Sequence, residues 1–566
     1  MSDADDTADV VVVGSGAGGA PVAYALASAG ARVVVLEKGS HVGPDDKVHD
    51  EIRICRRNLW VPYPEDEPHT LRQGAGPAQR TSEGWTANVV GGATVHFNGY
   101  FFRMHPVDLR LRTALGPVDG ADLADWPITY DELEPYYARV EREIGISGRW
   151  RCHPFEEPRS ADYPFPPLAE DPIATRIDDA CRTLGIHPFP TPRAILSRPF
   201  KDRPPCNYCA LCAGYACEYG AKSSTSVSLL PAAVATGRCE IRTESMATEI
   251  QLGPDGNVSG VLYRDLRHDP RNLGRGPIGP RARGGQRRIR ARCVVLACTA
   301  VESARLLLSS TSSRFPSGLG NTSRQVGKHL VFSGTGLGRG RFFHPRGEPL
   351  RGFPFVQRAL QDFYFLDKPV DGVRKAGTIL FDWEHPNPIN TAERLSRDRG
   401  GLVWGKRLKD SLRRNAAGAR TLRFEAFSEY LPTPGTYVDL DPDVKDRWGA
   451  PVARMTEARH PLDLKATRFL VERGMEILRA LPADEAAAES TSGVTRFLQG
   501  GTCRFGDDPA TSVLDRHCKL HEVDNLYVTD GSFMPNGGSV PPTLTILANS
   551  FRVADHIARR FKDRTL

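Results

Sequence analysis

A glycine-rich turn near the N-terminus constrains the fold of this chain more than any other feature. The turn, Gly14-Ser15-Gly16-Ala17-Gly18-Gly19, follows a run of four valines at 10–13 and precedes an alanine-rich stretch at about 21–29. A continuous β-branched run is typical of a strand that is buried on both faces. Strand, G-x-G-x-x-G turn and helix in this order predict a βαβ unit that binds a dinucleotide.

The glycines of the turn have separate tasks in such a unit. Gly14 allows the tight turn, Gly16 lets the backbone approach a pyrophosphate, and Gly19 lets the helix pack close to the strand. The helix N-terminus would then meet the negative charge of the pyrophosphate. Glu37 follows a second strand-like run at 32–36, where an acidic side chain accepts hydrogen bonds from the adenosine ribose. A carboxylate there would repel a 2′-phosphate, which argues against NADP.

The composition is that of a globular enzyme. The 566 residues are 40% hydrophobic and 25% charged, and the chain is long enough for two domains. The formal net charge of +6 is too small for a nucleic-acid-binding surface. No apolar run approaches the roughly 20 residues of a membrane-spanning helix. The acidic N-terminus does not resemble a secretory signal, so we expect a cytoplasmic protein.

Other segments indicate what surrounds the dinucleotide unit. Residues from about 40 to 87 are rich in proline, glycine and charge, and we expect them to be irregular. The alternating segments 423–428 and 436–440 predict antiparallel strands, and 406–414 predicts a charged helix. A buried strand at 525–531 precedes a helix at about 543–560. The chain is therefore expected to be an α/β protein with a second, antiparallel sheet.

Five separated segments of the chain resemble the glucose–methanol–choline (GMC) family of FAD-dependent oxidoreductases. These segments are the N-terminal unit and residues 90–96, 297–307, 501–509 and 530–546. They follow one another in the family's order over nearly the whole chain. The resemblance implies that the dinucleotide is FAD and that the enzyme oxidises a hydroxyl group.

The resemblance also implies a division into interleaved domains. A Rossmann-type FAD-binding domain would be assembled from residues 1–100, 200–315 and 497–566. A substrate domain built on an antiparallel sheet would comprise residues 101–199, with connecting segments, and residues 316–496.

The C-terminal segments carry part of the FAD site that the resemblance implies. Asp530 and Gly531 would lie at the pyrophosphate or the ribitol of FAD. The backbone at Thr543 and Leu544 would approach the pyrimidine side of the flavin. A helix N-terminus at that position would stabilise the negative charge of the reduced ring.

The segment after the second glycine pair would pass the middle of the flavin ring. Its side chains there are Thr94, His96 and Asn98. Several members of the family attach the flavin covalently through a histidine at the position of His96. The alternative is a histidine that only packs beside the ring.

This chain departs from the family at the two positions that handle the substrate proton. The family places a histidine where this chain has Leu498, and an asparagine or histidine where it has Pro541. Neither leucine nor proline has a side chain that can accept a proton.

Three explanations are open for this departure. Another polar group nearby in sequence, Gln499 or Asn536, would serve, although an amide is a poor base. A group from the substrate domain, such as Glu429 or His460, would have taken over. Alternatively, the protein has lost alcohol oxidation and uses its flavin differently or only structurally.

Four cysteines lie within twelve residues, at Cys206, Cys209, Cys212 and Cys217. Their spacing, C-x₂-C-x₂-C-x₄-C, is one residue from a ferredoxin run that binds an iron–sulfur cluster. Four thiolates would also suffice for zinc. Related multisubunit dehydrogenases resemble this segment and can carry an iron–sulfur cluster. The alternative is a set of buried thiols or a local disulfide.

Taken together, these features favour the oxidation of a hydroxyl on a sugar, aminosugar or glycoside. Hydride would pass to flavin N5, and oxygen or another acceptor would reoxidise the flavin. A second hypothesis is a dye- or quinone-linked dehydrogenase subunit, in which an iron–sulfur cluster relays electrons to a partner. A third is a flavin-binding protein without alcohol oxidation.

Overall fold

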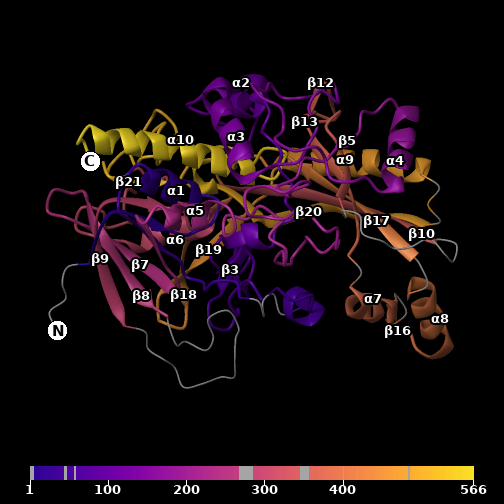
Figure 1. Ribbon diagram of the computed structural model, residues 1–566, viewed down its shortest axis with the longest axis horizontal. Helices are drawn as coiled ribbons and strands as arrows, with labels where there is room; N and C mark the ends of the chain where they lie inside the picture. Colours follow the sequence, from indigo (N-terminus) through magenta and orange to yellow (C-terminus); the bar gives the residue numbers. More distant parts are fainter. Residues whose placement is uncertain are drawn as a thin grey trace.

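The computed structural model of this chain contains three main β-sheets with helices packed around them (Figure 1). These sheets have seven, six and four strands, and two short hairpins lie outside them. The structure describes residues 6–43, 47–56, 59–266, 285–343, 356–385, 387–398, 401–416, 419–481, 483 and 485–566.

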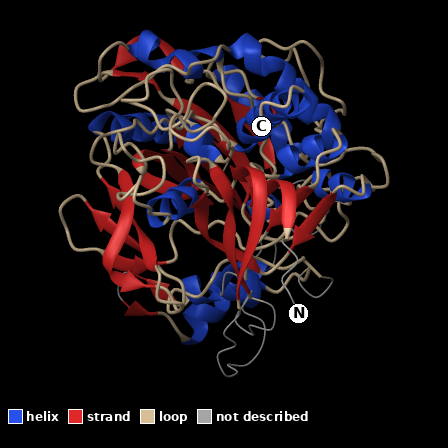
Figure 2. Cartoon of the chain, turned by 90° about the vertical axis from the view of Figure 1, so that its left-hand side faces the viewer, coloured by secondary structure: helices blue, strands red, loops and turns tan. Residues whose placement is uncertain are grey.

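The seven-stranded sheet is built around the predicted N-terminal unit. Strand β1 (Thr7–Val13) lies between β2 (Val33–Leu36) and β9 (Gln286–Leu296) and is parallel to both. Its valines are buried. Helix α1 (Ala20–Ser28) packs against α10 (Thr543–Lys562) and against β2. Strands β7 to β9 lie at the left of Figure 1, the side that Figure 2 turns to the viewer. The other strands of this sheet are β6 (Cys239–Arg242), β7 (Ser245–Leu252), β8 (Val258–Asp265) and β21 (Leu526–Val528).

The six-stranded sheet is antiparallel throughout, in the order β20-β10-β17-β14-β11-β5. Helix α9 (Pro461–Ala480) packs against β10, β17 and β20. The ring of Phe424 fits between sheet and helix because Gly338 and Gly474 have no side chains; a Cβ on Gly474 would lie 2.7 Å from that ring. The strands are β5 (Phe189–Pro190), β10 (Lys328–Phe343), β11 (Val356–Leu360), β14 (Gly377–Trp383), β17 (Ala419–Ser428) and β20 (Glu485–Thr502).

The third sheet corrects the expectation that residues 40–87 are irregular. Strands β3 (His69–Gln73) and β4 (Gln79–Thr81) lie in this segment. Strand β3 pairs with β19 (Pro451–Glu457), which also pairs with β18 (Tyr437–Lys445). Strands β3 and β19 are almost 400 residues apart in the chain, so no local pattern in the sequence could indicate that they pair.

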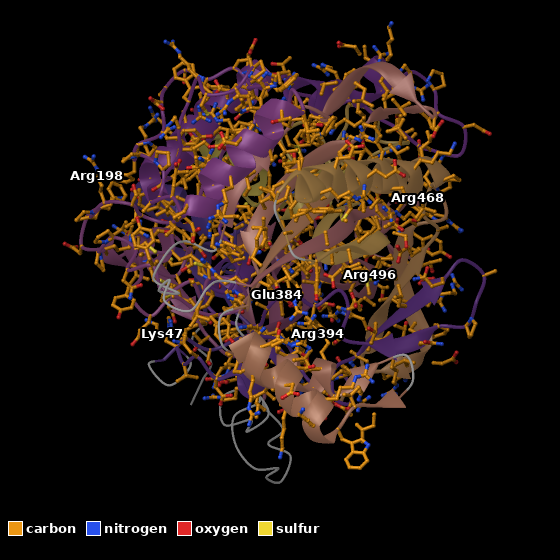
Figure 3. The ribbon with its side chains drawn as sticks, turned by 90° about the vertical axis from the view of Figure 1, so that its right-hand side faces the viewer. Lys47, Arg198, Glu384, Arg394, Arg468 and Arg496 are labelled. Atoms are coloured by element: carbon orange, nitrogen blue, oxygen red, sulfur yellow. The ribbon has the colours of Figure 1, made fainter. Side chains whose placement is uncertain are left out.

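The remaining elements connect the sheets or project from them. Helices α7 and α8 form a projection at the lower right of Figure 1, and Arg394 on α7 and Arg468 on α9 both lie at this end of the molecule (Figure 3). Among the described residues, no helix is both long and apolar enough to cross a bilayer. The helices are α2 (Leu111–Leu115), α3 (Tyr130–Ile144), α4 (Pro172–Thr183), α5 (Leu229–Ala235), α6 (Ala300–Ser309), α7 (Pro388–Leu395) and α8 (Gly405–Ala416). Short helical turns are Ile52–Arg56, Gly92–Val95, Pro106–Arg110 and Gly531–Phe533, and the hairpins are β12 (Phe365–Val370) with β13 (Val373–Lys375) and β15 (Arg397–Asp398) with β16 (Gly401–Leu402).

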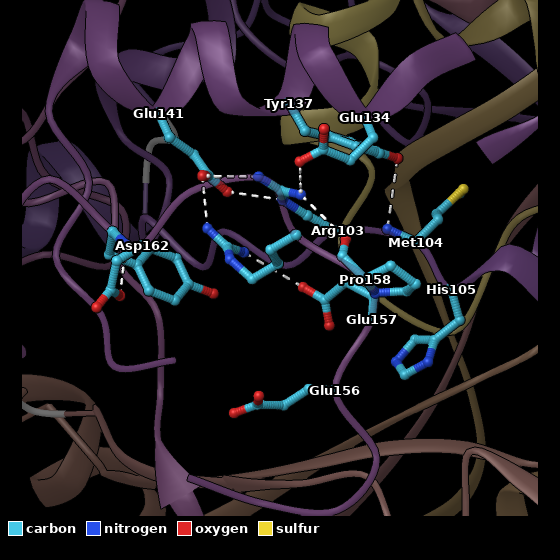
Figure 4. A network of polar contacts seen from close by, with 12 residues as sticks. Arg103, Met104, His105, Glu134, Tyr137, Glu141, Glu156, Glu157, Pro158 and Asp162 are labelled. Carbon is cyan, nitrogen blue, oxygen red and sulfur yellow. Dashed lines mark hydrogen bonds and ion pairs between the residues drawn. The ribbon is translucent and has the colours of Figure 1, made fainter. Parts of the chain in front are cut away.

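A buried arginine ties the segment after the second glycine pair to α3 (Figure 4). Arg103 is only 1% exposed. Its guanidinium donates two hydrogen bonds to Glu141, at 3.0 and 2.9 Å, and one to Glu134, at 2.9 Å. Glu141 also accepts a hydrogen bond from Arg159 at 2.5 Å. Both glutamates project from α3, so this network fixes the segment against the helix.

The expected fold class is confirmed: a Rossmann-type sheet and a separate antiparallel sheet are assembled from alternating parts of the chain. We retain the five-part division of the domains as a proposal.

Candidate functional site

A cavity of about 580 Å³ is lined by both large sheets and by the loops between them. Most residues predicted to bind FAD line it, although they come from distant parts of the chain. Two do not: Gly19 lies behind the turn, and Leu544 is buried in the core. The predicted residues that line the cavity are Gly14, Gly16, Glu37, Thr94, His96, Asn98, Asp530, Gly531 and Thr543.

At the N-terminal end of the cavity, the turn leaves no room for side chains. Gly14 has φ +101°, and a Cβ at this position would overlap the carbonyl oxygen of Ala297. A Cβ on Gly19 would overlap the carbonyl oxygen of Gly14 and lie 3.0 Å from the side chain of Val12. At its glycines the turn therefore presents backbone without side chains to the cavity, at the start of α1, as a pyrophosphate requires.

Glu37 is held rigidly at the end of β2. Its Oε2 accepts hydrogen bonds from the amide and the hydroxyl of Ser15, at 3.1 and 2.5 Å, and its Oε1 accepts one from the amide of Gly39 at 2.8 Å. Burial raises the pKa of Glu37, and these hydrogen bonds oppose that rise. A carboxylate oxygen can accept more than one hydrogen bond, so Glu37 retains capacity for a ribose hydroxyl.

Asp530 and the start of α10 border the cavity from the C-terminal part of the chain. Asp530 accepts hydrogen bonds from the hydroxyl of Ser303 at 2.5 Å and from the amide of Ser532 at 2.9 Å. Burial raises the pKa of Asp530. The N-cap of α10 is Pro542, whose side chain makes no capping hydrogen bond. The first amides of α10, beginning at Thr543, therefore offer hydrogen bonds and a positive helix end to an anion.

His96 packs in an aromatic environment on the middle of the cavity wall. Its imidazole is stacked on the indole of Trp60, with 5.6 Å between ring centroids. Its Nε2 lies 3.0 Å from the carbonyl oxygen of Thr86. Burial lowers the pKa of His96 to about 4, so the ring is neutral near pH 7. A carbonyl oxygen can only accept, and Nε2 therefore carries the proton.

Leu498 and Pro541 both line the cavity, as their positions in the family pattern imply. Gln499 also lines it, but its amide is engaged by the protein: Nε2 donates to the carbonyl oxygens of Gly84, at 2.5 Å, and Arg496, at 3.0 Å. Its Oε1 accepts a hydrogen bond from the amide of Val301 at 3.3 Å. Gln499 thus holds the backbone of neighbouring segments together.

The other three candidates for a relocated proton acceptor are not among the residues that line the cavity. Asn536 donates a hydrogen bond to the carbonyl oxygen of Asp108 at 2.7 Å. Glu429 is buried 3.5 Å from the ammonium of Lys375. His460 caps α9 and has its Nε2 2.8 Å from the carbonyl oxygen of Asp119. The structure thus gives each of them a structural partner.

A polar wall that the sequence analysis missed is formed by β17. The hydroxyl of Ser428 lies 2.7 Å from that of Thr467 on α9, which places the even-numbered side chains of this strand on the helix side. Successive side chains of a strand alternate between faces, so Arg423, Glu425 and Phe427 face the cavity, which they line. The signal was present in the sequence, because two charged residues share one face of a predicted strand.

The structure does not support a metal site at the four clustered cysteines, one of the alternatives that their spacing left open. Among the described residues, which include all four, no group of three or more His, Cys, Asp or Glu side chains is arranged to hold a metal ion. Burial raises the pKa of Cys206 to about 12 and also raises that of Cys209, so both are neutral thiols in the metal-free protein. An iron–sulfur cluster or zinc at these residues is therefore not supported.

The cysteine segment instead forms part of the cavity wall. The ammonium of Lys222 donates hydrogen bonds to the carbonyl oxygens of Phe97 at 3.0 Å, Cys212 at 2.9 Å and Tyr215 at 2.7 Å. The amide of Gly214 donates to the carbonyl oxygen of His96 at 2.9 Å. Through these hydrogen bonds the segment is fastened to the residues beside His96.

Comparisons with known proteins are in agreement with this geometry. Residues 168–333 and 432–550 match the two sequence models described as GMC oxidoreductase, and residues 12–53 match an NAD(P)-binding Rossmann-like domain. The chain is 31% identical to 2-methyl-1,2-propanediol dehydrogenase of Mycolicibacterium austroafricanum, over 100% of this chain and 97% of the relative. It is also 31% identical to paromamine 6′-oxidase of Streptomyces fradiae, over 98% of this chain and 92% of the relative.

A solved structure shares the fold at lower sequence identity. Pyridoxine 4-oxidase from Mesorbium loti superposes with a TM-score of 0.61 at 18% identity, covering 97% of this chain and 99% of that one.

Proposed function

This chain belongs to the GMC oxidoreductases, a family of FAD-dependent enzymes, and from that premise we propose that it oxidises a hydroxyl group of a sugar, an aminosugar or a related polyol. One observation carries the proposal: the dinucleotide-binding turn and the polar wall of β17 line the same cavity. A substrate held against that wall would share the cavity with the flavin. Relatives whose names describe dehydrogenases and oxidases of diols and aminoglycosides support this assignment.

The residues that line the cavity fit FAD. A diphosphate requires bare backbone at a helix N-terminus, and Gly14 and Gly16 supply it. Glu37 would accept hydrogen bonds from the adenosine ribose. Asp530 would contact the pyrophosphate or the ribitol of FAD. The free amides at the start of α10 would face the pyrimidine side of the flavin. When bound, FAD would supply the two-electron acceptor for hydride from the substrate carbon that bears the hydroxyl. The hydroxyl proton would leave to solvent, because the side chains at positions 498 and 541 cannot accept it.

The protein's own contribution would be to bind and orient the substrate in a site shielded from water. Leu498 and Pro541 would exclude water from the reacting carbon, because both are apolar and line the cavity. Positioning of the hydroxyl would depend on polar side chains elsewhere in the cavity, since neither of these two residues can form a side-chain hydrogen bond. We propose oxygen as the final acceptor, which the relatives whose names describe oxidases support.

Anaerobic mixing with candidate substrates tests this function. The panel consists of paromamine, D-glucosamine, D-glucose and 2-methyl-1,2-propanediol. We expect at least one of them to bleach the visible absorbance of the flavin and to yield one carbonyl product per flavin. Readmitting air should restore the absorbance and release hydrogen peroxide. If no member of the panel bleached the flavin, the proposed oxidation would be wrong. If artificial acceptors restored the flavin absorbance and air did not, the proposal that oxygen is the acceptor would be wrong.

We further propose that FAD is bound without a covalent bond to the protein. The Nε2 proton of His96 is donated to the Thr86 carbonyl, and stacking on Trp60 fixes the plane of the ring. A bond to flavin at Nε2 would break this hydrogen bond and leave a buried carbonyl without it, a loss of about 1–3 kcal/mol. Acid precipitation is therefore expected to release all the flavin into the supernatant. Yellow protein pellets from the wild type, and colourless ones from a His96→Ala variant, would instead demonstrate covalent attachment through His96.

A further inference from the structure

The charges on the β17 wall do not cancel. Arg423 is paired in two hydrogen bonds with Asp382 of the neighbouring strand β14, at 3.1 and 2.7 Å. Asp382 therefore neutralises the positive charge of Arg423. Glu425, two residues along β17, is left as an additional carboxylate that borders the cavity.

One carboxylate oxygen of Glu425 has no hydrogen-bond partner among the described residues. Its Oε2 is buried, and no residue in the part of the chain that the structure describes donates a hydrogen bond to it. Burial raises the pKa of Glu425 to about 7, while Arg423 lowers it and Asp382 raises it. A buried carboxylate without a donor is costly, so a group of this kind calls for a cation or a donor from a ligand.

Two aromatic rings lie on the same wall. Tyr100 and Phe427 line the cavity and pack edge to face, with 6.1 Å between their centroids. The hydroxyl of Tyr100 is buried and has no hydrogen-bond partner among the described residues. The face of an aromatic ring attracts a cation, and a hydroxyl can donate to or accept from a sugar. A carboxylate beside two rings is a suitable environment for an ammonium group.

We propose that Glu425 binds an ammonium group of the substrate and that this enzyme therefore acts on an amino sugar in preference to a neutral polyol. The inference rests on the proposed function, because it assigns a substrate class to the same cavity. Arg423, Asp382 and Tyr100 interact electrostatically with Glu425, and the guanidinium of Arg193 lies 5.7 Å from the ring centroid of Tyr100. Arg423 and Asp382, the two charged groups that shift the pKa of Glu425, neutralise each other, so ionised Glu425 adds one negative charge to β17.

The first test uses Glu425→Gln, which removes the charge and keeps the shape. A hydrogen bond to a charged group is worth enough to lower affinity by about 10- to 100-fold when it is lost. We expect KM for paromamine to rise by about this factor. KM for the neutral panel member that reduces the flavin should change less than about twofold, and Glu425→Asp should retain part of the preference for paromamine.

The second test measures binding without turnover and needs no variant. Cyclohexylammonium is a cation that has no hydroxyl to oxidise, and it stays protonated from pH 6 to 8. With a pKa of about 7, the ionised fraction of Glu425 rises roughly tenfold over this range. We expect the oxidised holoenzyme to bind this probe about tenfold more tightly at pH 8 than at pH 6. At pH 6, binding should release about one proton, detected by calorimetry in buffers of different ionisation enthalpy.

Three results would overturn the inference. One is pH-independent binding of cyclohexylammonium by the wild type. Another is a Glu425→Gln variant that keeps the wild-type KM for paromamine. The third is a variant with an equal loss of kcat on neutral and cationic substrates, which would make Glu425 a proton acceptor. Failure of the proposed function is distinguishable, because a flavin that no panel member reduces leaves the cyclohexylammonium measurement intact.

Discussion

Replacing Gly19 by alanine is expected to leave the protein largely without FAD. The added Cβ would overlap the carbonyl oxygen of Gly14 and press on the side chain of Val12. Both obstacles belong to the turn and strand, so the start of α1 must move away from β1. Strain of this kind costs about 1–3 kcal/mol, which corresponds to a loss of roughly 10- to 100-fold in affinity for FAD. Flavin absorbance per chain and titration with added FAD measure the effect.

A glycine elsewhere provides the control for this substitution. Gly285 begins the connection into β9, and a Cβ at this position meets nothing within 4 Å. Gly285→Ala is therefore expected to contain as much flavin as the wild type. Equal flavin content in Gly19→Ala and Gly285→Ala would show that the turn does not carry the dinucleotide.

Replacing Arg103 by alanine is expected to have the largest effect on stability. The substitution leaves Glu134 and Glu141 buried and without their guanidinium, and they are no more than 11% exposed. Loss of one partner of a buried ion pair costs about 3–5 kcal/mol. Because Arg159 still donates to Glu141, we expect a loss near 3 kcal/mol in the free energy of unfolding, measured by denaturant titration at constant temperature.

The exposed pair of Arg182 and Asp179 on α4 is the matched control. Their side chains are 74% and 60% exposed, and their nitrogen and oxygen atoms lie 2.6 Å apart. Solvent screens such pairs, so Arg182→Ala should cost less than about 1 kcal/mol. If Arg103→Ala were no more destabilising than Arg182→Ala, the network around Arg103 would not be a source of stability.

The dinucleotide unit could be predicted because its information is local. The four buried valines, the glycine turn and Glu37 lie within a single short stretch, and each residue type there has one physical task. The antiparallel character of β17 could also be predicted, since alternation of side chains is a property of the strand itself. The pairing of β3 with β19 could not, because it depends on a partner almost 400 residues away.

The sequence could not predict which side chains pair with one another, because those partners are also far apart in the chain. Glu425 and Glu429 are alike in type and lie four residues apart on one strand and its continuation. Only packing shows that Lys375 pairs with Glu429, whereas Glu425 borders the cavity. Likewise, the spacing of the four cysteines suggested a metal site. Only the structure shows that carbonyl oxygens of this segment bind the ammonium of Lys222 and that, among the described residues, no group of three or more ligand side chains is arranged to hold a metal ion.

By itself, the sequence determined the class of fold, the nucleotide-binding turn and the absence of a proton acceptor at positions 498 and 541, since these depend on residue type and short-range order. Only the tertiary structure decided which charges remain uncompensated. Charge compensation depends on distances between residues far apart in the chain, and burial makes an unpaired group costly.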